Sequence, residues 1–164
     1  MKARLLGLAA LAVAAGCMSD LDERAAPASL DEAYFRCRVQ PVLTKSCSAF
    51  LCHGDPERYF RIYARNRLRL GGTEATRNRA LEEAERAFNF GSALGFVDAA
   101  DPASSLLLMK PLDENGGGYY HGGATEFGQG DVFSSRNEPD FKVVAAWING
   151  EKEDPTCVEP GSDL

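Results

Sequence analysis

The chain lacks several features that would assign it to common classes of protein. Its 18 lysines and arginines are outnumbered by 24 aspartates and glutamates, and the formal net charge is −6. No basic cluster is present, which argues against a nucleic acid or an anionic lipid surface as the partner. A nucleophile elbow, a phosphate-binding loop and a paired-carboxylate motif are also missing, so nothing in the sequence favours a hydrolase. Histidine is scarce, with His53 and His121 as the two in the whole chain.

Long hydrophobic runs are scarce too. The one apolar run, residues 5–15, is too short to span a bilayer, follows Lys2 and Arg4, and precedes a Gly-Cys junction at Cys17. These features predict a signal peptide over residues 1–16. The residues before Cys17 resemble the bacterial lipobox, which implies that Cys17 is lipidated; an ordinary secretory signal with an incidental cysteine is the alternative. Either way we expect export to a compartment where disulfides persist.

The rest of the chain suits one domain. Removing 16 of the 164 residues leaves 148, enough for a single core. The polar, Ala/Pro-rich composition of residues 17–29 predicts a tether, and residues 30–158 are expected to form the domain. A lipid at Cys17 would anchor the protein to the bilayer facing the periplasm, and Met18, which is not aspartate, favours the outer membrane.

Two of the five cysteines lie close together and precede a histidine. Residues 47–54 read Cys-Ser-Ala-Phe-Leu-Cys-His-Gly. In the common attachment site for haem c, two cysteines separated by two residues bind the haem, and the next histidine becomes an iron ligand. Here the spacer has four residues, but the Cys52-His53 dipeptide is kept. The motif therefore predicts covalent haem c on Cys47 and Cys52, with His53 as the proximal ligand.

The remaining cysteines follow from this assignment by count. If Cys17 carries lipid and the motif carries haem, Cys37 and Cys157 are left and are expected to form a disulfide. A Cys47–Cys52 disulfide without haem is the rival assignment. A zinc site on these two cysteines and the two histidines is a further alternative, although an adjacent cysteine and histidine rarely point at one metal ion.

Apolar periodicity predicts an all-α domain with long glycine-rich loops. Helices are expected over residues 30–46, 74–90 and 101–109, and from residue 137 or 138 to 150. Pro41 should kink the first helix. Glu82, Glu83 and Glu85 indicate a solvated helix face, and surface acids are the expected partners of most arginines between residues 58 and 69. Residues 115–130 should form a loop whose backbone passes close to another group.

Four segments together resemble a known family. They are Val-Gln-Pro-Val-Leu at 39–43 followed by the Cys-Cys-His-Gly site, Ser-Leu-Leu-Leu at 105–108, His-Gly-Gly at 121–123, and Trp-Ile-Asn-Gly at 147–150. Over residues 30–150 they look like the small haem-c domains of planctomycete-type cytochromes and their myxobacterial lipoprotein relatives. This resemblance implies a single-haem, cytochrome c-like fold whose first and last helices pack together, which would bring Cys37 near Cys157.

The second axial ligand has two candidates. In the family that the chain resembles, an iron-binding methionine lies in a loop between the Ser-x-Leu segment and the last helix, and His121 falls in that region. Met109 is the alternative, although its position in a short apolar helix favours a packing role. The glycines at 122 and 123 would let the loop approach the haem closely. We therefore expect iron bound by His53 and His121.

Together these features predict a lipid-anchored c-type cytochrome that faces the periplasm. It would carry electrons through one haem to a periplasmic redox protein, without turning over a substrate. A haem-free, disulfide-stapled lipoprotein that acts as a binding or structural module is one alternative. An enzyme in which a five-coordinate haem handles peroxide or a small ligand is another.

Overall fold

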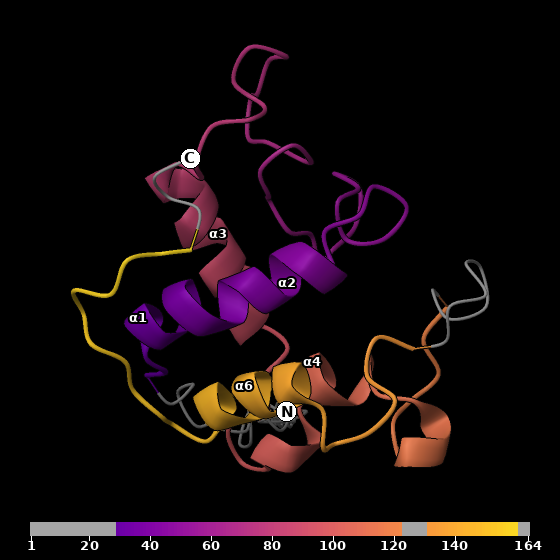
Figure 1. Ribbon diagram of the computed structural model, residues 1–164. Coiled ribbons are helices and arrows are strands. Elements are labelled where there is room, and N and C mark those ends of the chain that lie inside the picture. Colours follow the sequence, from indigo (N-terminus) through magenta and orange to yellow (C-terminus); the bar gives the residue numbers. More distant parts are fainter. Residues whose placement is uncertain (1–28, 123–130, 161–164) are drawn as a thin grey trace, which may run out of the picture.

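Helices joined by long turns make up the structure, which is a computed structural model that describes residues 29–122 and 131–160 (Figure 1). These residues contain no strand, in agreement with the expected all-α class; one isolated bridge joins Leu112 to Phe133. In the described part of the chain, no helix is long and apolar enough to cross a membrane. Cys17 and all but the last residue of the expected tether lie outside it.

The first helical segment runs from residue 32 to residue 46 in three parts. These are α1 (Glu32–Tyr34), a π-helical turn η1 (Phe35–Val39) and α2 (Gln40–Ser46). Asp31 caps the start by accepting a hydrogen bond from the backbone N–H of Tyr34 (2.6 Å). Pro41 has no N–H to donate one turn back, and the preceding Gln40 bonds to the carbonyl of Phe35 in a wider turn. At the place where a kink was predicted, the structure has a π-helical turn that ends two residues before Pro41.

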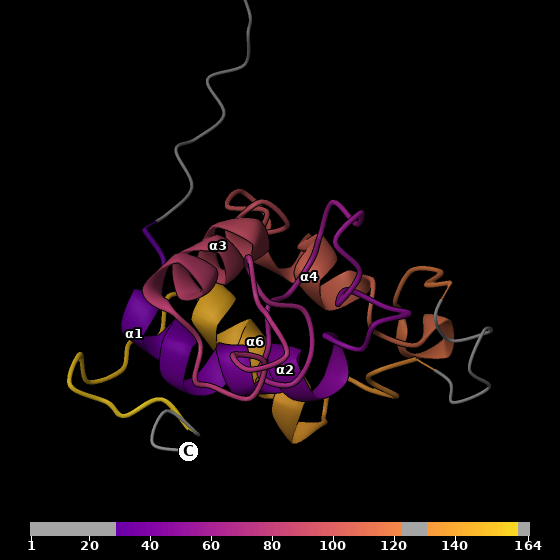
Figure 2. The ribbon, with the colours of Figure 1, turned by 90° about the horizontal axis from the view of Figure 1, so that it is seen from above.

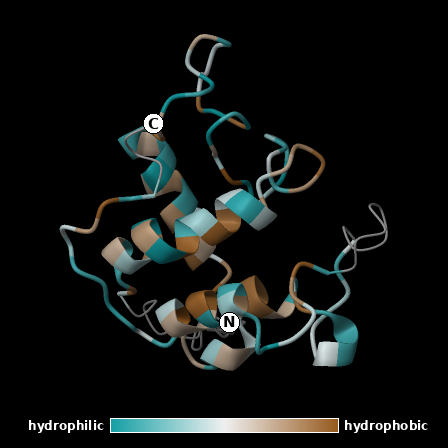
Figure 3. Cartoon of the chain, viewed as in Figure 1, coloured by the Kyte–Doolittle hydropathy of each residue, from teal (hydrophilic) through white to brown (hydrophobic). Residues whose placement is uncertain are grey.

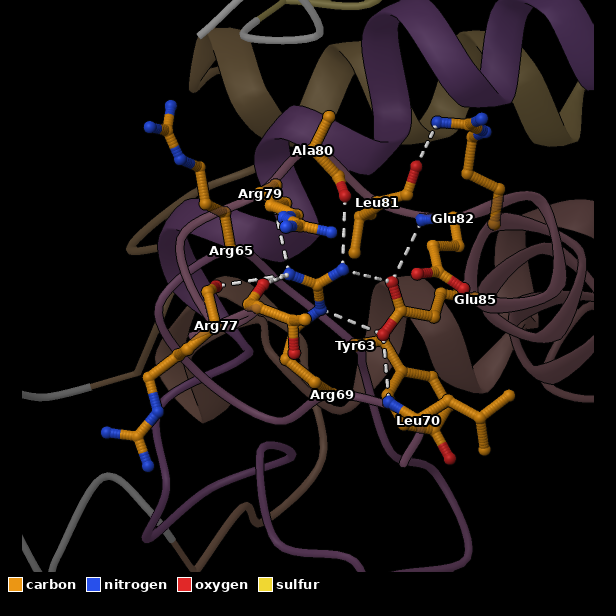
Figure 4. A network of polar contacts seen from close by, with 12 residues as sticks. Tyr63, Arg65, Arg69, Leu70, Arg77, Arg79, Ala80, Leu81, Glu82 and Glu85 are labelled. Atoms are coloured by element: carbon orange, nitrogen blue, oxygen red, sulfur yellow. Dashed lines mark hydrogen bonds and ion pairs between the residues drawn. The ribbon is translucent and has the colours of Figure 1, made fainter. Parts of the chain in front are cut away.

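The second helix, α3 (Glu83–Leu94), begins later than expected. A capping box starts it, because the side chains of Glu82 and Glu85 each bond the other's backbone N–H. Residues 74–82 form turns instead of the predicted helical start. Their carbonyl groups are used elsewhere: those of residues 76, 77, 79 and 80 accept hydrogen bonds from the guanidinium of Arg69 (Figure 4).

Glu85 corrects the prediction of a fully solvated glutamate face. Its side chain is 2 % exposed and pairs with Arg69, itself 5 % exposed, at 2.8 Å. Burial opposes the charged carboxylate, but the hydrogen bonds from Arg69 and from two backbone N–H groups outweigh it and lower the pKa of Glu85. Glu83 on the same helix is 78 % exposed, as predicted for such a face.

Three short helical elements and a final helix complete the fold. They are η2 (Pro102–Ser104), α4 (Leu106–Met109) with η3 (Glu114–Gly116) after it, and α6 (Pro139–Ile148). Proline at the first position starts α6, and Gly150, with φ of 88°, follows its end. Figure 3 shows many apolar residues in α4 and α6, and residues of both helices belong to the buried core.

An aromatic cluster holds the first segment, α3 and α6 together. The Phe35 ring lies 5.3 Å from Phe90 and 5.1 Å from Trp147, measured between ring centroids. Trp147 is fully buried, and its indole N–H donates to the carbonyl of Asp31 at 2.9 Å. Figure 2 shows α3 and α6 lying against the first helical segment, with which both make contact.

A disulfide ties the two ends of the domain. It joins Cys37 in η1 to Cys157 after α6, which is the pair expected from the sequence. Cys47 and Cys52 are free thiols, so the rival Cys47–Cys52 bridge is not formed.

Candidate functional site

A cavity of about 620 Å³ lies between α2, α4, α6 and the loops around them. Its size is within the usual range for small-molecule and cofactor sites, about 300 to 1,000 Å³. The walls are mainly apolar side chains, among them Val42, Leu43, Phe60, Phe96, Leu107 and Val144. Backbone hydrogen bonds between residues 111–113 and Phe133 join the segment after α4 to the segment before α6 at one side of the cavity.

Four residues predicted from the sequence meet at this cavity. Cys47 at the end of α2, Cys52 and His53 from the following loop, and His121 from the second half of the chain all line it. The two imidazole rings are nearly parallel, with an angle of 13° between their planes and 6.1 Å between their centroids. Residues that are 68 positions apart in the sequence thus face one another in space (121 − 53 = 68).

The loop between the two cysteines is closed by its own backbone. The N–H of His53 donates to the carbonyl of Cys47 (3.0 Å), and the N–H groups of Cys52 and Gly54 both donate to the carbonyl of Ala49 (2.9 Å each). Phe50, in the middle of the spacer, is 73 % exposed. Residues 49–51 of the wide spacer are therefore exposed to solvent, while both cysteines line the cavity.

Gly54 is required by this loop, and the sequence analysis assigned it no role. A Cβ atom built at Gly54 would lie 2.3 Å from the carbonyl oxygen of Ser48. Ser48 is fully buried. Its hydroxyl donates to the carbonyl of Thr44 (2.6 Å) and accepts a hydrogen bond from Arg67 (2.9 Å). The carbonyl therefore has little freedom to move away, and a side chain at position 54 would displace the loop that carries His53.

The orientation of His53 is set by backbone contacts. Its Nδ1 lies 2.6 Å from the carbonyl oxygen of Phe60. Because a carbonyl can only accept, Nδ1 carries the proton and Nε2 is left with a free lone pair. Burial lowers the pKa of His53, against the opposing effect of the Phe60 carbonyl. The ring is therefore a neutral imidazole at neutral pH, the form that binds metal ions.

The buried side-chain amide of Asn89 supports the segment that holds the His53 loop in place. The side chain of Asn89, on α3, accepts from the N–H of Tyr63 (2.8 Å) and donates to the Tyr63 carbonyl (2.8 Å) and to Gln40 (2.9 Å). The neighbouring N–H of Ile62 donates to the carbonyl of His53 (2.6 Å). The first segment, α3 and the histidine loop are thus connected by one set of hydrogen bonds.

His121 has a different neighbour. Burial lowers the pKa of His121, opposed by the carboxylate of Asp131, whose Oδ1 lies 3.8 Å from the ring Nδ1. Lys110 also lines the cavity, and its ammonium donates to the carbonyl of Tyr120 at 2.8 Å, next to His121. Asp131 was not predicted as a site residue, since an isolated aspartate after a glycine-rich loop has no distinguishing pattern.

Met109, the alternative iron ligand, is placed outside the cavity lining. Its side chain is buried, and its sulfur accepts a hydrogen bond from Arg136 at 3.4 Å. Its carbonyl accepts from the N–H of Tyr119 (2.7 Å), so Met109 fixes the start of the segment that carries His121.

The glycine-rich loop makes one close approach in its described part. A Cβ at Gly118 would lie 1.8 Å from the carbonyl oxygen of Leu112. At Gly122 a Cβ would meet no protein atom within 4 Å, and Gly123 lies outside the described residues. The steric need for glycine is therefore shown at position 118.

The donor set fits a covalently held haem. Two free thiols and two neutral imidazoles lie on one apolar cavity, and burial raises the pKa of the Cys47 thiol to about 12, which keeps it protonated at neutral pH. Within the described ranges, no group of three or more His, Cys, Asp or Glu residues could hold a metal ion by itself.

No protein-family model, curated protein or solved structure matches this chain. Its function must therefore be inferred from the cavity and the residues that line it.

Proposed function

We propose that the protein is a c-type cytochrome that carries electrons through one haem bound in this cavity. Cys47 and Cys52 would hold the haem by thioether bonds, and His53 and His121 would be its axial ligands. The observation that carries the proposal is the pair of imidazoles that face one another across an apolar cavity lined by both motif cysteines.

The separation of the two rings suits this role. A ring centre lies about 1.1 Å from the coordinating nitrogen, and a metal–imidazole bond is about 2.0 to 2.1 Å, so two imidazoles on opposite sides of one metal ion have centres about 6.2 to 6.4 Å apart. The observed distance is 6.1 Å. The spacing of the ring centres is therefore that of an axial pair, which would further require both Nε2 atoms to point toward the iron.

Each cavity residue would have a defined task. The Phe60 carbonyl fixes the tautomer of His53, which leaves Nε2 for the metal. The apolar walls exclude water, and Lys110 is the cation at the cavity that could neutralise a haem propionate. When bound, the haem supplies an iron that changes between its ferric and ferrous states. Because two protein ligands would fill both axial positions, the proposal favours electron transfer over the peroxide-handling enzyme.

The cellular setting is part of the same proposal. Attachment of lipid at Cys17 would hold the protein at the outer membrane, facing the periplasm, where a soluble or membrane-bound redox protein would exchange electrons with it. Two histidine ligands would give a lower reduction potential than a histidine–methionine pair.

Covalent haem is the direct test. The full chain is produced in a bacterial host competent for haem-c maturation, and the purified protein is extracted with acidified acetone. We expect the haem to stay with the polypeptide and the iron to be low-spin. Protein that folds, shows an intact Cys37–Cys157 disulfide and carries no covalent haem would overturn the proposal.

A pair of variants tests the axial ligands. His121→Ala should give a high-spin iron open to imidazole or CO, because it removes a ring at the cavity. Met109→Leu is the matched control, since the Met109 side chain lies outside the cavity lining and should leave the spectrum unchanged. The reverse pattern would assign the ligand role to Met109.

A haem-free binding module is the second candidate. The centroid separation of the two histidines also lies within the range of ordinary aromatic pairs, about 4.5 to 7 Å, which needs no metal. The disulfide stabilises the fold without a cofactor, and the cavity is apolar. Absence of covalent haem, together with tight binding of an apolar fluorescent probe that His121→Trp blocks, would support this function instead.

A further inference from the structure

We propose that Asp131 is a positioning residue for His121 and makes the two axial ligands unequal. Its carboxylate would accept a hydrogen bond from Nδ1 of His121, directing Nε2 toward the metal and increasing the electron donation of the ring. This inference rests on the proposed function, and it concerns a residue that the haem-attachment motif does not contain.

The burial of Asp131 is the first observation. Its side chain is 9 % exposed and lines the cavity, and Oδ1 accepts no hydrogen bond from any described residue. A buried carboxylate oxygen without a donor is costly, and such oxygens are found where a function needs them. The ring Nδ1 of His121, at 3.8 Å, is within reach of that oxygen.

The distance requires a small movement. At 3.8 Å the two atoms are farther apart than in a hydrogen bond, which needs about 2.7 to 3.2 Å. Polar contacts at functional sites are often long until the site is filled and then shorten. Holding the His121 ring as a ligand would fix Nδ1 as a donor, because its other nitrogen would be committed to the metal.

The two histidines would then differ in their outer partners. His53 donates to a neutral carbonyl, that of Phe60, whereas His121 would donate to a carboxylate. A charged acceptor makes a stronger hydrogen bond and raises the basicity of the imidazole. The His121 side would therefore bind ferric iron more strongly, which lowers the midpoint potential and slows replacement of His121 by an external ligand.

The experiment compares three variants of the haem-loaded full chain. Asp131→Asn removes the charge and keeps the shape, Asp131→Glu keeps the charge, and Asp55→Asn removes one charge from the segment that carries His53. Asp55 already bonds the N–H of Glu57 at 2.9 Å and does not line the cavity, so it controls for a general effect of charge. The readouts are the midpoint potential and the rate at which exogenous imidazole displaces a ligand.

Asp131→Asn should raise the midpoint potential and speed the displacement of His121 by imidazole several-fold. Asp131→Glu should return both quantities toward the wild-type values. Asp55→Asn should change neither quantity. In the unsubstituted ferrous protein, which is diamagnetic when low-spin, the Nδ1–H of His121 should show the ¹H and ¹⁵N shifts of a strong hydrogen bond. A low-spin Asp131→Asn protein with unchanged potential and unchanged imidazole kinetics would refute the role of Asp131 while leaving the cytochrome proposal intact. Wild-type protein without covalent haem would overturn the cytochrome proposal, and this inference with it.

Discussion

Replacement of the buried Glu85 by Gln is expected to destabilise the fold strongly. The carboxylate accepts four hydrogen bonds, two from Arg69 and one each from the backbone N–H groups of Leu70 and Glu82. An amide in its place has one acceptor oxygen and an NH₂ group that would face donors. Since removal of one partner from a buried ion pair costs about 3 to 5 kcal/mol, we expect the free energy of unfolding to fall by about that amount.

Glu83→Gln is the matched control on the same helix. Glu83 also pairs with an arginine, Arg86 at 3.3 Å, but it is 78 % exposed. Exposed ion pairs contribute about 0 to 1 kcal/mol, so this variant should unfold almost like the wild type. The assay is urea denaturation followed by far-UV circular dichroism with the disulfide intact, comparing midpoints at constant slope.

The pH dependence gives a second signature. Because the pKa of Glu85 is lowered on folding, its stabilising effect is complete above its ordinary value of 4.5 and is lost as the pH falls through the lower folded pKa. The difference between wild type and Glu85→Gln should therefore shrink in acid. A loss below about 1 kcal/mol at pH 7, equal to that of the control, would refute the argument that this ion pair is buried and structurally required.

Three further predictions follow from the site and the disulfide. Gly54→Ala should prevent normal closure of the cysteine loop and reduce covalent haem in haem-staining gels, whereas Gly91→Ala, an open position of α3 outside the cavity lining, should be tolerated. Cys157→Ala should lower the free energy of unfolding by about 3 to 5 kcal/mol in the chain-entropy model, measured in urea, and should spare haem attachment. In haem-free protein, NMR titration should show both histidines with pKa values below 6.5. The folded state then resists protonation of both rings, so the free energy of unfolding should fall as the pH drops below 6.5. A pKa above 6.5 for either ring would contradict its burial.

The sequence predicted elements whose signals are local. The first and last helices have clear apolar spacing. Pro139 marks the start of the last helix, whereas the first begins at residue 32 after its cap Asp31, two residues later than expected. The start of α3 was predicted too early because residues 74–82 have helical composition. The Arg69 side chain competes with a helix there, because it binds the backbone carbonyls of four of those residues, and apolar periodicity does not reveal a competing side chain.

The site was predicted in part for the same reason. The Cys-Cys-His motif predicted His53 as a ligand, and the loop position of the iron-binding methionine in the resembled family predicted His121; the structure places both rings at one cavity. Asp131 and Asn89 could not be found this way. Each acts through tertiary contacts, and in the sequence neither differs from an ordinary surface polar residue.

If the protein is exported and carries haem as proposed, the burial of Cys47 sets an order of events for maturation. In the folded chain this sulfur lies in the cavity wall, 9 % of the residue is exposed, and its high thiol pKa leaves little of the reactive thiolate. An enzyme that attaches a cofactor to Cys47 would work best before the chain has folded, when the segment that bears His121 has not yet packed against the cavity. Thioether formation would then come early, and oxidation of Cys37 with Cys157, which brings the two ends of the domain together, would come late. Premature oxidation in the periplasm would compete with loading, so the yield of mature protein should depend on which of the two reactions reaches the nascent chain first.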